Sequence, residues 1–95
     1  MSKDELRQII EWLKQERRGT QRTSGGYRRG KLAELDVMMA EAKAAIGIET
    51  LIEDWSERGE VLKREHRYES HLGKYALGCL YLDAVKFIES LEGNH

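Results

Sequence analysis

Arginine and lysine are concentrated in residues 17–31 of this 95-residue chain, and these cations are the side chains best suited to bind a ligand. The segment contains six cations and no acid. Guanidinium groups donate paired hydrogen bonds to phosphate and carboxylate oxygens, hydroxyl groups add further donors, and an aromatic ring can stack on a nucleobase. The sequence therefore predicts an anion-binding site built from Arg17, Arg18, Arg22, Thr23, Ser24, Tyr27, Arg28, Arg29 and Lys31.

Residues 19–30 hold four glycines and three Ser or Thr hydroxyls, a composition that favours a loop over a helix or strand. A helix beginning at Lys31 would point its free N–H groups at a phosphate held by this loop. The segment contains neither a Walker-type nor a dinucleotide-binding glycine motif. The alternative is a solvated loop whose arginines pair with the chain's own acids within residues 34–60.

The neighbouring stretch is acidic, because residues 32–60 carry eight acids against two cations, and the whole chain has a formal net charge of −1. An acidic flank repels the backbone of long duplex DNA and offsets the attraction of the basic loop. A nucleotide or a short single strand suffers less from that repulsion, so such ligands are the expected ones.

Other residues capable of chemistry give weaker signals. His66 and Glu69 have helical metal-ligand spacing, but His71 diverges from them, so we expect no metal site. The single cysteine, Cys79, has no nucleophile-activating partner in the pattern, so we expect no enzyme activity and no cofactor. A lone cysteine, a charged N-terminus and the lack of a long apolar run indicate a cytoplasmic chain with no membrane partner.

The pattern of apolar residues predicts an all-α fold in a single helical domain spanning 1–95. We expect a short helix over 1–18, the basic loop, and a long antiparallel helical hairpin made of residues 31–58 and 60–92. The apolar stripe of 31–58 jumps to another face near Gly47, so the helix either breaks there or continues against different neighbours. The sequence Arg58-Gly59-Glu60 predicts the end of that helix.

The last predicted helix has an apolar arc wider than one partner helix can cover, which indicates a central helix or a homo-oligomer seam. The expected interface residues are Tyr75, Cys79, Leu80, Leu82, Asp83 and Phe87. Gly73 and Gly78 indicate a close approach of another backbone. Asp83 falls on the apolar side, where it either pairs with an arginine or reaches solvent.

These observations support two hypotheses about function. In the first, a small oligomeric, non-enzymatic protein captures a nucleotide or nucleic-acid phosphate through residues 17–31. In the second, the chain is an inhibitor or adaptor that binds a larger host protein, because small helical accessory proteins of phages and mobile elements share this general plan. This second hypothesis rests on a similarity of overall architecture alone.

Overall fold

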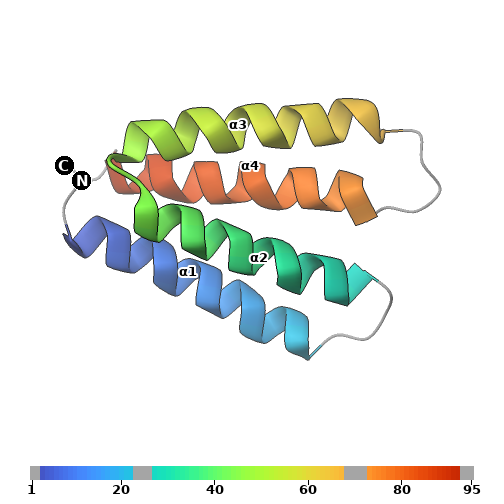
Figure 1. The fold of residues 1–95 in the computed structure, drawn as a ribbon, viewed down its shortest axis with the longest axis horizontal. Helices are drawn as coiled ribbons and strands as arrows, with labels where there is room; N and C mark the ends of the chain where they lie inside the picture. Colours follow the sequence, from blue (N-terminus) through green and yellow to red (C-terminus); the bar gives the residue numbers. More distant parts are fainter. Residues whose placement is uncertain (1–2, 23–26, 68–72, 93–95) are drawn as a thin grey trace. The chain divides into compact units, whose positions relative to one another are not determined.

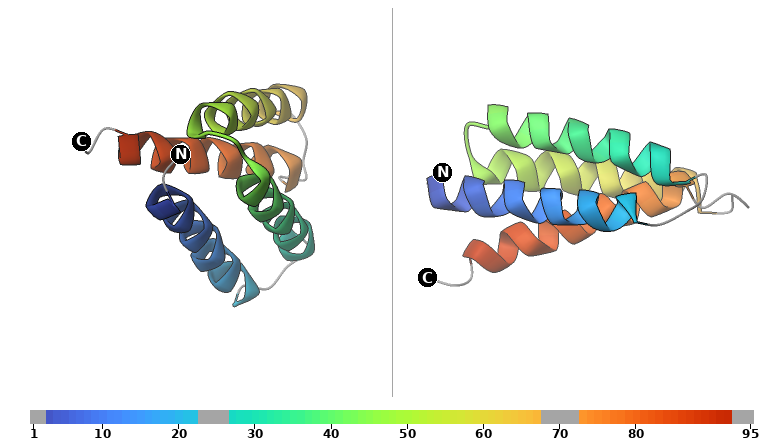
Figure 2. Two further views of the ribbon diagram at one scale, coloured as in Figure 1. Left: turned by 60° about the vertical axis from the view of Figure 1, so that its left-hand side comes forward. Right: turned by 90° about the horizontal axis from the view of Figure 1, so that it is seen from below.

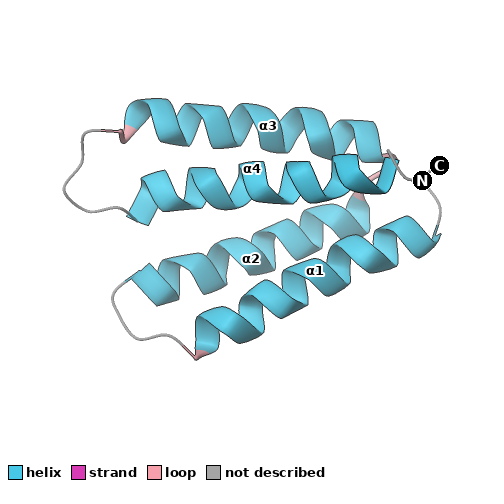
Figure 3. Ribbon diagram, turned by 180° about the vertical axis from the view of Figure 1, so that it is seen from behind, coloured by secondary structure: helices cyan, strands magenta, loops and turns pink. Residues whose placement is uncertain are grey.

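The computed structural model describes residues 3–22, 27–67 and 73–92, and nearly all of them are helical. The four helices are α1 (Lys3–Gln21), α2 (Tyr27–Ala44), α3 (Ile48–Glu65) and α4 (Gly73–Glu92) (Figure 1). Every regular element of the described ranges is a helix (Figure 3). The all-α prediction is confirmed.

The chain divides into two compact units, residues 1–46 and residues 47–95. In the first unit α1 packs against α2, and in the second α3 packs against α4. Each pair runs antiparallel as a helical hairpin, as the views in Figure 2 show. The predicted long hairpin of residues 31–58 and 60–92 is correct from Ile48 on, where α3 pairs with α4, and wrong for α2, which pairs with α1 instead.

Helix α1 extends past the predicted end at Arg18 and continues through Gly19 and Thr20 to Gln21. The Thr20 side chain is buried, and its hydroxyl donates a hydrogen bond to the Glu16 carbonyl oxygen at 2.7 Å. That bond satisfies the hydroxyl inside the helix, so Thr20 needs no loop conformation. Packing against α2 outweighs the modest helix-propensity cost of Gly19.

Helix α2 begins at Tyr27, four residues before the predicted start at Lys31. Arg28, Arg29 and Gly30 are thus helical, and a Cβ atom on Gly30 would meet no other atom within 4 Å. The predicted loop over 19–30 is wrong at both of its ends. Residues 23–26, including Thr23 and Ser24 of the predicted site, lie outside the described residues.

Of the two alternatives near Gly47, the structure shows the break. Residues 45–47 are not helical, and Gly47 has an extended conformation (φ −155°, ψ 161°) directly before α3. The buried side chains of α3 include Ile48, Leu51 and Trp55, at spacings of three and four residues. A helical restart at Ile48 lets this stripe face its own partner, so the jump in the sequence pattern marks the boundary between the hairpins.

Gly59 does not end a helix, because it lies buried inside α3, which continues to Glu65. The last helix begins at Gly73 instead of Glu60. A Cβ atom on Gly59 would lie 2.9 Å from the Gly78 carbonyl oxygen, and one on Gly78 would lie 2.8 Å from the Gly59 carbonyl oxygen. The two glycines therefore let α3 and α4 touch backbone to backbone, which confirms the close approach expected at Gly78.

Aromatic side chains add to the contact between α3 and α4. Trp55 and Tyr81 are fully buried, and their rings meet edge to face with centroids 6.0 Å apart. The Arg58 guanidinium donates a hydrogen bond of 2.9 Å to the Tyr81 hydroxyl and lies 5.1 Å from the ring centroid. This hydrogen bond gives the buried Tyr81 hydroxyl a polar partner.

The six expected interface residues all lie on α4, and their exposure differs. Leu80 is buried, Asp83 is exposed, and Tyr75, Cys79, Leu82 and Phe87 are partly buried. No ion pair within residues 3–22, 27–67 and 73–92 involves Asp83. Its exposure fits the simpler of the two interpretations, and self-association through this face stays a prediction.

Candidate anion-binding groove

A groove of about 440 Å³ lies between α1 and α2, toward the end of the first hairpin where the two helices are joined. Five α1 residues line it, at positions 12, 15, 16, 19 and 20, together with Tyr27, Arg28 and Lys31 from the first turns of α2. The α1 positions recur at three and four residues and thus share one helix face. The extension of α1 past Arg18 is what completes this face.

Two aromatic rings supply the apolar part of the groove. Tyr27 is 37% exposed at the first position of α2, and Trp12 of α1 is partly buried. Gly19, without a side chain, leaves open space beside them. A flat apolar ligand can contact rings that are placed this way, because every nucleobase has a π face that stacks on an aromatic side chain.

The cations of the groove are Arg28, which is exposed, and Lys31, which is partly buried. The Lys31 ammonium lies 3.4 Å from a carboxylate oxygen of Glu16, across the hairpin. Glu16 reduces the positive charge of the groove and holds Lys31 in place. The groove therefore presents one exposed cation, Arg28, beside a lysine that is paired with a carboxylate.

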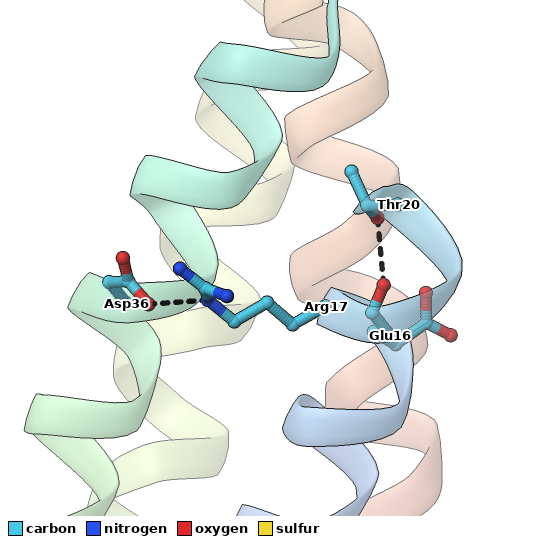
Figure 4. A network of polar contacts seen from close by, with 4 residues as sticks. All are labelled: Glu16, Arg17, Thr20 and Asp36. Atoms are coloured by element: carbon cyan, nitrogen blue, oxygen red, sulfur yellow. Dashed lines mark hydrogen bonds and ion pairs between the residues drawn. The ribbon is translucent and has the colours of Figure 1, made fainter. Parts of the chain in front are cut away.

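Two further predicted site residues pair with acids of the same unit. Arg17 of α1 reaches Asp36 of α2, with Nε 3.0 Å from the carboxylate oxygen (Figure 4). A guanidinium nitrogen of Arg18 lies 3.5 Å from a carboxylate oxygen of Glu11, and both residues belong to α1. Both pairs are more than one-third exposed, so each contributes well under about 1 kcal/mol to stability.

Three of the six predicted cations, Arg17, Arg18 and Lys31, are thus engaged by carboxylates of the first unit. The alternative, in which the arginines pair with the chain's own acids, is therefore realised in part. Its acids differ from those expected, because Glu11 and Glu16 precede the basic segment and Asp36 alone falls within 34–60. Pairing along a hairpin follows from the α1–α2 packing, which the sequence did not predict.

Arg22 and Arg29 have no such partner. Both side chains are exposed, and neither forms an ion pair with any residue that the structure describes. Arg22 follows the end of α1, and Arg29 lies in the first turn of α2. These two arginines are therefore the predicted cations best placed to meet an outside anion.

The predicted site contained none of the five α1 residues that line the groove, which are Trp12, Gln15, Glu16, Gly19 and Thr20. Trp12 lies at the edge of the apolar stripe of α1, and Glu16 follows it by four residues. A helix that ends at Arg18 leaves out Gly19 and Thr20, so its sequence pattern does not predict a groove on this face. With the helix carried to Gln21, the spacing of these residues predicts one continuous strip.

Comparisons with known protein families, with curated proteins and with solved structures found no match. Within the described ranges, none of the four helices combines the length and hydropathy needed to span a bilayer. Those ranges also hold no cluster of three or more potential metal ligands, while Glu69 and His71 lie outside them.

Proposed function

We propose that this chain is a small, non-enzymatic binding protein that captures an anionic ligand carrying a nucleobase. The ligand is a nucleotide or a short single-stranded nucleic acid, held in the groove of the first hairpin. The observation that supports this most is that Trp12, Tyr27 and Arg28 line the same groove. Rings and cations together match a ligand that is flat at one end and charged at the other.

The size of the groove fits such a ligand. Its volume of about 440 Å³ lies within the range of small-molecule sites, which runs from about 300 to 1,000 Å³. A base lying against Tyr27 leaves its phosphate close to the first turn of α2, where Arg28 and Arg29 are exposed. The groove has room for one nucleotide and no means of enclosing a duplex.

The local pairing of cations limits the strength of binding. With Arg17, Arg18 and Lys31 engaged by acids, we expect the other three arginines of the segment, Arg22, Arg28 and Arg29, to displace the counterions of a nucleic acid. Log affinity for a single strand should then fall with log salt at a slope of roughly −2, since each neutralised phosphate contributes about −0.7. A slope near −4 would instead mean that the ion pairs open to release all six cations.

The proposal is tested by the fluorescence anisotropy of a labelled oligothymidylate, titrated with the wild-type chain and with Arg28→Ala/Arg29→Ala. We expect the double variant to lose roughly tenfold or more in affinity, because two charge-assisted contacts are removed. The matched control is Arg7→Ala/Lys14→Ala, which removes the same charge from exposed positions of α1 outside the groove. Equal losses in both variants would show that only net charge matters.

A different result would favour the second hypothesis. If the wild-type chain binds neither the oligonucleotide nor a mononucleotide, the groove does not serve an anionic base. Capture of one stoichiometric protein from a nuclease-treated host lysate would then support an inhibitor or adaptor. In that case loss of the partner with Arg28→Ala/Arg29→Ala would place the contact on the same basic segment.

A further inference from the structure

The second hairpin has a groove of its own, about 490 Å³ in volume. Four lining residues come from the last part of α3 and the turn after it, Glu60, Lys63, Arg64 and Arg67, and Tyr75 comes from the first turn of α4. Like the first groove, it combines cations with a tyrosine from the incoming helix. None of its residues belongs to the anion-binding site expected from the sequence.

The tyrosine has a different role in this groove. The Lys63 ammonium lies over the Tyr75 ring, 5.7 Å from its centroid. A cation in this position is attracted by the π electrons and held there. The face of Tyr75 that Lys63 covers is closed to a nucleobase, whereas Tyr27 of the first groove is 37% exposed.

Two cations of this groove are not neutralised by a carboxylate in the way that Arg17 and Lys31 of the first hairpin are. Neither Lys63 nor Arg64 forms an ion pair with any part of the chain that the structure describes, and Arg67 adds a third cation to the lining. Glu60, the one acid among the described lining residues, is exposed and also forms no ion pair there. A groove with two such cations and a third beside them suits a compact anion of more than one charge.

We propose that the groove of the second hairpin binds an oligophosphate, two or more linked phosphate groups, and recognises it by charge alone. Arg64 and Arg67 donate to phosphate oxygens, and Lys63, held on Tyr75, adds a fixed ammonium. Glu60 opposes binding. The ligand is either a free oligophosphate or the phosphate chain of a nucleotide, and the base of a nucleotide makes no contribution.

The test is isothermal titration calorimetry with sodium tripolyphosphate, carried out in the Arg28→Ala/Arg29→Ala background so that the first groove is disabled. Adding Arg64→Ala/Arg67→Ala should weaken tripolyphosphate binding by roughly tenfold or more. Adding Arg7→Ala/Lys14→Ala, which removes the same charge elsewhere, should leave the affinity within about twofold. Far-ultraviolet circular dichroism checks that each variant keeps its helices.

A second variant tests the sign of the effect. Glu60→Gln removes the opposing carboxylate and should strengthen tripolyphosphate binding by about two- to fivefold, the range measured for exposed charge pairs. ATP should bind this groove within about threefold of tripolyphosphate. An ATP affinity more than tenfold higher that is lost with Arg64→Ala/Arg67→Ala would overturn recognition by charge alone.

Failure of this proposal is distinct from failure of the first. Tripolyphosphate binding that is absent, or that survives Arg64→Ala/Arg67→Ala, overturns the second groove and leaves oligothymidylate binding to Arg28 and Arg29 untouched. Loss of oligothymidylate binding with retained tripolyphosphate binding has the opposite meaning.

Discussion

The first hairpin links its helices with charged side chains, whereas the second brings its backbones into contact. Between α1 and α2, Arg17 reaches Asp36 and Lys31 reaches Glu16. Between α3 and α4, Gly59 and Gly78 meet directly, with Trp55 and Tyr81 buried beside them. The groove of the first hairpin is lined by an exposed ring, Tyr27, and a partly buried one, Trp12. The groove of the second hairpin is lined mainly by cations.

The glycines of the two hairpins make the same contrast at single positions. Gly19 and Gly30 lie inside α1 and α2 with nothing within 4 Å of an added Cβ atom. Gly59 and Gly78 lie inside α3 and α4, where an added Cβ atom would fall under 3 Å from backbone atoms. A glycine inside a helix therefore marks a close helix contact in the second hairpin and faces open space in the first. The sequence alone does not distinguish these two cases, because the difference lies in the packing.

The largest expected effect tests the backbone contact. Gly78→Ala should lower the free energy of unfolding by about 1–3 kcal/mol, because the new methyl group would lie 2.8 Å from the Gly59 carbonyl oxygen and 3.0 Å from the Lys63 backbone nitrogen. Urea denaturation followed by circular dichroism measures the change. A variant as stable as the wild type would show that α3 and α4 have room to separate at no cost.

The same chemical change in the first hairpin should have the opposite sign. Gly30→Ala should raise the free energy of unfolding by about 0.5–1 kcal/mol, because alanine favours the helix and meets no neighbour. Urea denaturation under the conditions used for Gly78→Ala makes the two results directly comparable. If Gly30→Ala destabilises the chain, the start of α2 is not helical in solution.

The smallest effect concerns the ion pairs of the first hairpin. Asp36→Asn should lower stability by about 0.2–1 kcal/mol at low salt, because Arg17 loses its partner at an exposed position. The loss should disappear in about 1 M salt, where screening removes the attraction. Asp83→Asn is the matched control, since Asp83 is exposed and forms no ion pair within the described ranges. Identical salt curves for the two variants would contradict a role for the pair.

The helical class could be predicted from the sequence, because it depends on local periodicity. The same periodicity left two alternatives at Gly47, a break or a continuous helix with different neighbours. The jump of the apolar stripe near Gly47 contained the most information of these signals. It indicated either a break or a change of neighbours, and the structure shows that residues 45–47 separate two hairpins.

The continuation of the helices through Gly19, Gly30 and Gly59 could not be predicted, because glycine lowers helix propensity by only about 1 kcal/mol and tertiary packing outweighs that amount. The predicted partner of α2 was wrong because hairpin partners depend on contacts distant in sequence. Of the candidate site, Tyr27, Arg28 and Lys31 line one groove, and their proximity follows from their positions in the sequence. Trp12 and Glu16 join them only when α1 is known to reach Gln21.

The most direct test of the proposed function follows the two tryptophan side chains of the chain by nuclear magnetic resonance during titration with oligothymidylate. Trp12 lines the groove of the first hairpin, and Trp55 is fully buried between α3 and α4. We predict that the indole N–H resonance of Trp12 moves with bound ligand while that of Trp55 stays in place. Binding that leaves the Trp12 resonance unmoved would contradict the assignment of the groove.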